Sequence, residues 1–370
     1  MKKIYTIALL FVATIAFSQA GAPAAPYYNG FNWSQTGTTL KNALATKITT
    51  THTRKISYDN VWDASQATDL DPTDGTNTNV LLLYGFSNNI CPSSSSDGDD
   101  HRRRNKNSTG GGNSCQWNRE HTYAKSLGTP ALVDGGSGST SDAGEDAHHI
   151  RPSDVDRNGD RGSKKFAAGS GNSGNVSGGW YPGDEWKGDV ARMMMYMYLR
   201  YPTQCLPKNV GTGTAVSTDT NMLNLFLQWN AEDPVSAYED RRNTYHGNTS
   251  NSYAQGNRNP FIDNPYLATV IWGGPVAENR WPNVFLSTED FTFAAVSIYP
   301  NPSNNHKINI ETEEVLDEIQ LVNINGQLMQ QIKNPNAQNN TYSLENLPSG
   351  FYFLKLTSEN HSTTKKIIVN

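Results

Sequence analysis

Long hydrophobic runs are scarce in this sequence of 370 residues. The longest, "IYTIALLFVATIAF", follows Lys2 and Lys3 and ends at the small residues of "SQAGA". A basic start, a short apolar run and a small-residue end are typical of an export signal. No later stretch approaches the roughly 20 apolar residues that a membrane-spanning helix needs. We therefore expect a signal peptide over residues 1–19, cleaved near Gln19 or Ala20, and no membrane span.

An excess of positive charge is also missing, because the formal net charge is −5. This argues against a protein that coats nucleic acid through bulk positive charge, but it leaves room for a local basic cleft. Basic residues concentrate in "HRRRNK" (101–106) and between residues 119 and 165. Taken alone, the "HRRRNK" run is typical of a solvated loop.

Cysteine is rare, and the three that are present cannot all pair within the chain. Cys91 and Cys115 bracket a long polar loop, and a disulfide between them would stabilise the fold by a few kcal/mol by closing that loop. We therefore predict a Cys91–Cys115 disulfide. Cys205 is then expected to be a free, buried apolar thiol.

Glycine is plentiful at 31 residues, and together with many Asn, Ser and Thr residues it predicts long irregular connections. The length suggests roughly two domains. Leu40, Leu44 and Ile48 lie at helical spacing within residues 36–50, which predicts a helix there. Residues 79–86 are expected to form a buried strand, and helices are predicted over 188–201 and 221–233, with the methionines at 193–197 in the core.

The composition changes again towards the C-terminus. Short runs of alternating apolar and polar residues, separated by turn sequences, predict a small β-sandwich over residues 296–370, after a linker at 287–295. The segments "YPNP", "NINGQLM", "LPSGFYFLKL" and "TKKIIVN" resemble the type A C-terminal sorting domain of the type IX secretion system. The resemblance implies a protein addressed across an outer membrane by that machinery. A carbohydrate-binding or adhesive module is the alternative.

Three polar stretches carry the candidate chemistry: "WNREHTYAKS", "EDAHHIRPSDVDRNGDRGSKKF" and "QGNRNPFID". Together they hold what metal-assisted phosphodiester cleavage needs. A neutral imidazole, His121, can accept a proton from an attacking water. Glu120 and Asn158 offer oxygen ligands for a hard divalent cation that acts as a Lewis acid. The first stretch and "AHHIRPS" are expected to be strands, and Asn158 is expected at the start of a helix. Arginines that could hold phosphate oxygens are Arg119, Arg151, Arg157 and Arg161.

These stretches resemble the endonuclease I family of secreted and periplasmic nucleases, members of the His-Me finger (ββα-metal) group. Further landmarks occur in the family's order over about residues 30–275: "GDVARMMMYMYLRY", "FLQWNAEDPVS", "RRN" and "QGNRNPFID". The resemblance implies His121 as general base, Glu120 and Asn158 as metal ligands, and Mg²⁺ or Ca²⁺ as the cation. Arg161 is expected to be a catalytic phosphate contact.

The family usually shows Asp-X-His-Asn where this chain has Asp146-Ala147-His148-His149. Asp146 and His148 match, His149 replaces the asparagine, and the role of His149 stays open. We expect His148 to contact substrate or support the site, and the substrate-binding residues to include Arg119, Arg151 and Arg258. For Arg258, anchoring of the fold is an equal alternative, whereas Asp189 and Arg192 are expected to form a buried ion pair.

The resulting expectation is an α+β protein. A ββα-metal nuclease core with mixed helices and long loops would occupy residues 20–286, followed by the linker and the small all-β sandwich. We expect a secreted or cell-surface monomer that hydrolyses DNA, with RNA left open, and with little sequence preference because phosphate contacts do not identify bases. The alternatives are a zinc hydrolase built on His121, His148 and His149, and a non-enzymatic adhesion protein.

Overall fold

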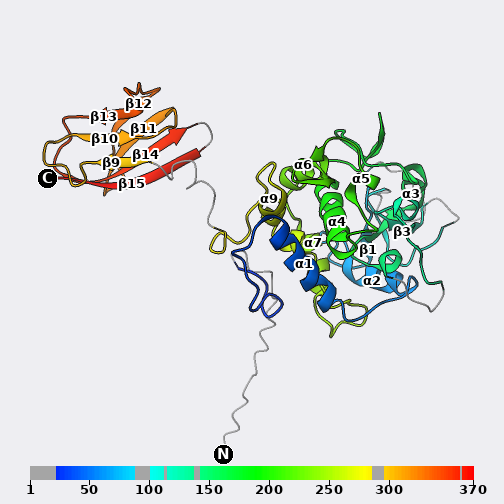
Figure 1. The fold of residues 1–370 in the computed structure, drawn as a ribbon. Helices are drawn as coiled ribbons and strands as arrows, with labels where there is room; N and C mark the ends of the chain where they lie inside the picture. The colour runs from blue at the N-terminus through cyan, green and yellow to red at the C-terminus, as the bar shows by residue number, and fades with distance from the viewer. Residues whose placement is uncertain (1–21, 88–100, 112–114, 137–141, 286–295, 359–360) are drawn as a thin grey trace, which may run out of the picture. The chain divides into compact units, whose positions relative to one another are not determined.

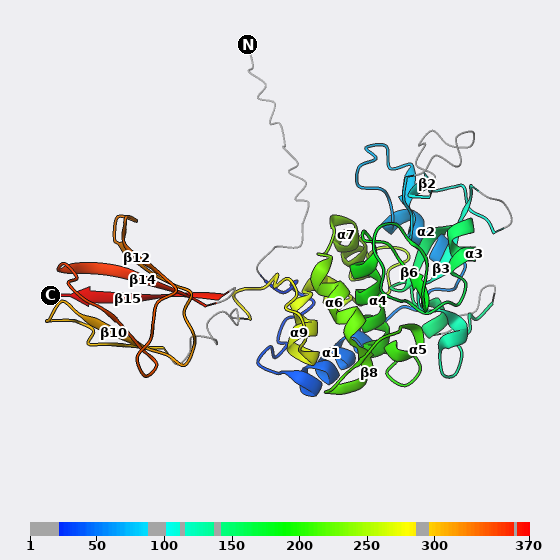
Figure 2. The same ribbon diagram turned by 90° about the horizontal axis from the view of Figure 1, so that it is seen from above.

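The computed structural model describes residues 22–87, 101–111, 115–136, 142–285, 296–358 and 361–370. The chain divides into two compact units, Met1–Val284 and Phe285–Asn370 (Figures 1 and 2). The expected signal peptide and linker lie outside the described residues, so both stay predictions. In the described part of the chain, no helix is long and apolar enough to cross a membrane.

The centre of the N-terminal unit is helix α4 (Lys187–Arg200), which is buried from Gly188 to Leu199 (Figure 1). The predicted helix ends just before Pro202, and its methionine cluster is in the core, as expected. Helices α1 (Gly37–Thr51) and α6 (Asn224–Glu232) pack against it. The other helices of this unit are α2 (Asn60–Thr68), α3 (Val155–Arg161), α5 (Pro207–Val210), α7 (Ala237–His246), α8 (Pro260–Asp263) and α9 (Tyr266–Trp272).

The apolar spacing that predicted α1 is confirmed, since Leu40, Leu44 and Ile48 are its buried residues. The start predicted for α6 was wrong. Residues Asp219–Leu223 instead form a strand, β8, that pairs with β7 (Ala215–Val216), so the helix cannot begin before Asn224.

The strands of the N-terminal unit form short antiparallel pairs. The predicted strand over 79–86 is shorter than expected: only Asn79–Leu81 is strand, although residues 79–85 are all buried. The pairs are β1 (Asn79–Leu81) with β2 (Arg103–Asn105), β3 (Trp117–His121) with β4 (Ile150–Asp154), β5 (Gly174–Val176) with β6 (Gly179–Tyr181), and β7 with β8.

The "HRRRNK" segment is not the solvated loop that its charge suggests. It contributes β2, and His101 and Arg104 are 6% and 1% exposed. Both contact Asp154 at the end of β4, and its carboxylate compensates the buried charge of Arg104. The predicted Cys91–Cys115 disulfide stays a prediction, because Cys91 lies outside the described residues, whereas Cys205 is free and buried as expected.

The C-terminal unit is the predicted β-sandwich. One sheet has the strand order β13-β10-β9 and the other β12-β11-β14-β15, all antiparallel. Apolar residues of both sheets, including Ile308, Ile310, Leu354 and Leu356, share one buried core. The strands are β9 (Ser297–Tyr299), β10 (Ile308–Glu311), β11 (Glu318–Asn323), β12 (Leu328–Lys333), β13 (Thr341–Leu344), β14 (Gly350–Ser358) and β15 (His361–Val369).

Candidate active site

The candidate site is built on β3, β4 and α3, which follow one another as strand, strand and helix. In the β3–β4 register, Glu120 lies opposite Arg151 and His121 opposite Ile150. Asp154 ends β4 and caps α3 by accepting the backbone N–H groups of residues 156 and 157 at 3.0 and 3.1 Å. This cap starts α3 at Val155, so the predicted helix start at Asn158 was three residues late.

A pocket of about 270 Å³ opens where β3 and α3 meet, which brings together residues that the sequence places some 40 positions apart. The predicted residues that line it are Arg119, Glu120, His121, Asn158 and Arg161. Ser126 and Ser163 also line it, were missed in the sequence, and join their hydroxyl groups at 3.0 Å. Both lie within the polar stretches quoted above, but no motif singled them out.

His121 is held as a neutral base. Its Nε2 lies 2.8 Å from the carbonyl oxygen of Gly144, and because a carbonyl can only accept, Nε2 must carry the proton. The other ring nitrogen, Nδ1, is then the basic one, and it has no hydrogen-bond partner among the described residues. Burial lowers the pKa of His121 to about 3, which keeps the ring neutral at physiological pH. The ring stacks on Tyr58 with centroids 5.2 Å apart.

Glu120 presents one paired and one unpaired carboxylate oxygen. Its Oε1 accepts hydrogen bonds from the Tyr84 hydroxyl and from Nη1 of Arg161, both at 2.9 Å. Its Oε2 has no hydrogen-bond partner within the described part of the chain. Burial raises the pKa of Glu120, and the positive charge of Arg161 opposes that rise.

Asn158 is oriented in the same way by its neighbour. Its side-chain Nδ2 donates to Oδ1 of Asn118 at 2.6 Å, which leaves the side-chain oxygen Oδ1 of Asn158 without a partner among the described residues. A carboxylate oxygen and an amide oxygen in one solvent-open pocket fit a hard divalent cation, and only two protein ligands suit Mg²⁺ because it retains several waters.

The two arginines of the pocket are both fixed by the protein. Arg161 is 1% exposed and holds the end of β3 by donating to Glu120 and to the carbonyl oxygens of His121 and Thr122, at 2.8 to 3.0 Å. Arg119 lies with its guanidinium over the ring of Tyr58, 3.5 Å from the centroid, and donates to the Tyr58 carbonyl. Arg161 therefore positions Glu120, and Arg119 forms a cationic wall of the pocket.

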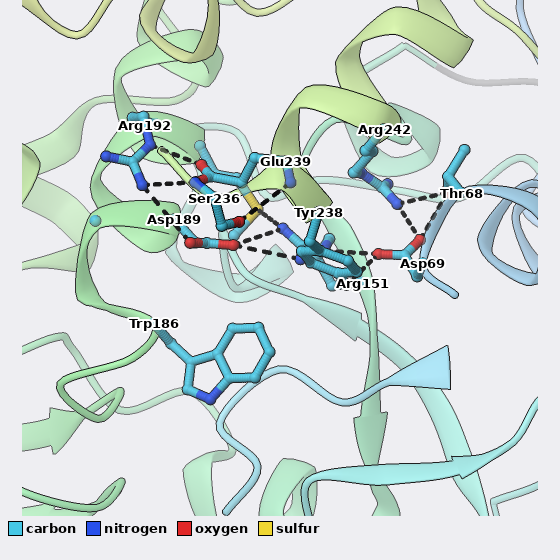
Figure 3. A network of polar contacts seen from close by, with 12 residues as sticks. Thr68, Asp69, Arg151, Trp186, Asp189, Arg192, Ser236, Tyr238, Glu239 and Arg242 are labelled. Carbon is cyan, nitrogen blue, oxygen red and sulfur yellow. Dashed lines mark hydrogen bonds and ion pairs between the residues drawn. The ribbon is translucent and has the colours of Figure 1, made fainter. Parts of the chain in front are cut away.

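Arg151 does not line the pocket, and its expected phosphate contact is not supported. It is 1% exposed, and its guanidinium is paired with Asp69 at 2.9 Å and with Asp189 at 3.4 Å (Figure 3). Side chains of β4 alternate in direction, and at Arg151 the direction leads into the core, where two carboxylates use its donors. Asp189 also pairs with Arg192 at 3.6 Å, which confirms the expected ion pair.

His148 and Arg258 are also buried away from the pocket residues. Nε2 of His148 lies 3.2 Å from the carbonyl oxygen of Asn257, and Arg258 is paired with Asp263 at 2.6 Å. For Arg258 this favours the anchoring role over substrate contact. For His148, neighbouring rings on α4 and α7 leave no approach for a polymer substrate, so the substrate role is not supported.

The three histidines of the zinc alternative do not converge on one point. His121, His148 and His149 direct Nε2 to the carbonyl oxygens of Gly144, Asn257 and Ala143 respectively. Within the described ranges, no group of three or more His, Cys, Asp or Glu side chains is arranged to hold a metal ion. The oxygen pair of Glu120 and Asn158 is a different kind of site, suited to a hydrated cation.

A strand–strand–helix unit with a neutral imidazole, a carboxylate and an amide around one pocket defines an enzyme site carried by an α+β domain. The chain belongs to the Endonuclease I family, whose sequence model matches residues 36–266, and it is accordingly a nuclease. A second family model, described as a secretion system C-terminal sorting domain, matches residues 297–370.

Two relatives are similar over most of the nuclease unit. An extracellular ribonuclease of Bacillus amyloliquefaciens is 39% identical over 248 residues, which cover 64% of this chain and 75% of the relative. An extracellular ribonuclease of Bacillus subtilis (strain 168) is 38% identical over 270 residues, which cover 68% and 82%. The sorting domain and these extracellular relatives together indicate a secreted or cell-surface protein.

Proposed function

We propose that this nuclease is a metal-dependent endonuclease that hydrolyses phosphodiester bonds in RNA and DNA with His121 as general base. One observation carries the proposal: His121 Nδ1, Glu120 Oε2 and Asn158 Oδ1 belong to three residues of one pocket, and none of these atoms is used by another described residue. The other polar atom of each side chain is hydrogen-bonded: Nε2 of His121, Oε1 of Glu120 and Nδ2 of Asn158. The free atoms are therefore held in fixed orientations.

Each residue of the pocket has its own role in the proposed hydrolysis. Nδ1 of His121 takes the proton from the attacking water, and the hydrogen bond from Nε2 to Gly144 O stabilises the imidazolium that forms. Glu120 Oε2 and Asn158 Oδ1 would hold the cation, and when bound it supplies Lewis-acid stabilisation of the phosphate charge. Arg119 adds fixed positive charge beside the scissile phosphate.

The substrate class follows from the kind of contact available. The pocket offers cationic, hydroxyl and amide groups suited to phosphate and sugar, which position a nucleic acid without identifying its bases. We therefore expect little sequence preference. The names of the two relatives place RNA among the substrates to test first.

The C-terminal unit adds a delivery role to this proposal. Residues 297–370 would be recognised by the type IX secretion machinery, and the nuclease unit would act outside the cell as a monomer.

The test compares matched RNA, single-stranded DNA and duplex DNA, each linear and circular, with the full chain. After chelation with EDTA, we expect cleavage to stop, and to return on addition of Mg²⁺ or Ca²⁺. Cleavage of the circular substrates would establish internal cutting. Undiminished cleavage in EDTA, after prior dialysis against chelator, would remove the metal from the proposal.

A further inference from the structure

The short 3₁₀ turn η2 (Ala143–Glu145) lies just before β4 and accepts hydrogen bonds from two imidazoles. Nε2 of His121 lies 2.8 Å from the Gly144 carbonyl oxygen, and Nε2 of His149 lies 2.8 Å from the Ala143 carbonyl oxygen. The two acceptors are consecutive in the chain. The orientation of one imidazole is therefore linked to that of the other through a single peptide unit.

The remaining contacts of His149 fix its own orientation and its tautomer. Its Nδ1 accepts from the backbone N–H of Tyr123 at 3.4 Å, so the proton must be on Nε2, where Ala143 accepts it. Its carbonyl oxygen accepts from the N–H of Thr122 at 3.0 Å. The His149 ring is fully buried and lies 5.6 Å, centroid to centroid, from the His121 ring.

The turn itself is confined on its other sides. A Cβ atom on Gly144 would lie 1.8 Å from the Val133 carbonyl oxygen, so the backbone at 133 is packed directly against the turn. Oε1 of Glu145 accepts the N–H of Tyr58 at 3.0 Å, and the ring of Tyr58 stacks on His121. The His149 hydrogen bond adds a contact to the turn from the residue that precedes β4.

We propose that His149 is a positioning residue for His121: its hydrogen bond to Ala143 holds the turn whose next carbonyl sets the ring orientation and tautomer of the general base. The inference rests on the proposed role of His121. It also gives a role to His149, whose function the sequence left open. His149 touches neither substrate nor cation and acts only through the turn.

The variants His149→Ala, His149→Asn and His149→Gln separate this role from simple loss of packing. We expect kcat to fall about 10- to 100-fold in the alanine and asparagine variants with KM unchanged, as when outer partners of site residues are removed. Glutamine can place its amide N–H near the position of Nε2, so His149→Gln should recover most of the lost kcat. The matched control is His246→Gln, a fully buried histidine of α7 that makes no contact with the turn, and it should keep the wild-type kcat.

A second readout does not depend on activity. ¹⁵N spectra of histidine-labelled protein should show His121 in a single Nε2–H tautomer in the wild type and in His149→Gln, and a mixture of tautomers in His149→Ala. An unchanged kcat in folded His149→Ala, or an equal fall in His149→Gln and His246→Gln, would overturn the inference. Failure of the proposed function would look different: the wild type itself would not cleave, whereas the His121 tautomer would still depend on His149.

Discussion

Two polar regions of the N-terminal unit differ in how their polar atoms are paired. The buried network, defined here as Asp69, Arg151, Asp189, Arg192, Glu239 and Arg242, pairs its charges within the chain (Figure 3). In the pocket, by contrast, Glu120, His121 and Asn158 each keep one polar atom free among the described residues. The pocket thus differs from the buried network in keeping polar atoms without a protein partner, which is what the proposed chemistry requires.

The buried network also holds β4, the strand that pairs with β3 beside the pocket. Asp69, at the end of α2, accepts from Arg151 and Arg242 and from the Tyr238 hydroxyl, the last at 2.5 Å. Arg242 in turn donates to the carbonyl oxygen of Ile150, the first residue of β4, and to that of Ala147 just before the strand. The network therefore fixes the strand that pairs with β3, while the pocket opens to solvent.

His121→Ala should give the largest difference between the effect on kcat and the effect on stability. Loss of the general base should lower kcat about 10²- to 10⁴-fold. The substitution removes the Nε2 hydrogen bond to Gly144 and the stacking on Tyr58 but leaves no buried charge unpaired, so the melting temperature should change less than for a substitution in the buried network. Single-turnover cleavage and thermal unfolding of the same preparation measure both quantities. Wild-type kcat in the folded variant would assign the base to another residue.

Asp69→Asn should give the opposite pattern. Removing one charge from a buried, paired group leaves Arg151 and Arg242 uncompensated and should cost about 3–5 kcal/mol of unfolding free energy. The matched control is Asp160→Asn on α3, whose side chain is 59% exposed and pairs with Arg157 at 3.5 Å, and which should cost less than about 1 kcal/mol. Urea unfolding compares the two variants. Equal costs would mean that the buried network does not stabilise the unit.

A graded effect is expected from acid. Burial lowers the pKa of His148 and of His149 to about 4, whereas an unfolded histidine titrates near 6.5. Between these values the unfolded chain binds protons that the folded chain does not, so stability falls as pH falls, by about 1.4 kcal/mol per pH unit for each histidine. Above pH 6.5 the contribution should be constant. In His149→Gln the slope of unfolding free energy against pH between 4 and 6.5 should be shallower, and an unchanged slope would argue against a buried neutral ring.

Local sequence patterns were sufficient to predict the elements whose formation depends on residues close together in the chain. Apolar spacing identified α1, the Gly-Asp start and the stop at Pro202 identified α4, and alternation with turn residues identified the sandwich. Neighbours along the strand gave Glu120 and His121 as a pair, and the structure places both at one pocket.

The roles of Arg151 and Arg161 could not be predicted, because each depends on a distant partner. Arg151 meets Asp69 and Asp189, which are 82 and 38 positions away in the chain. The early start of α3 has the same origin, since its cap Asp154 is held by Arg104 from another strand. Charge patterning shows which residues are ionised, but only the fold decides which charges meet.

The account depends most on a divalent cation held beside His121 by Glu120 and Asn158. Mn²⁺ added to histidine-labelled protein provides the most direct measurement, because a paramagnetic ion broadens the NMR signals of nearby nuclei. We predict that the ¹⁵N signals of His121 broaden at Mn²⁺ concentrations that support cleavage, and that Asn158→Ala requires more than tenfold higher Mn²⁺ for the same broadening, about 1.4 kcal/mol in binding. Sharp His121 signals in a wild-type protein that is cleaving nucleic acid with Mn²⁺ would contradict the account.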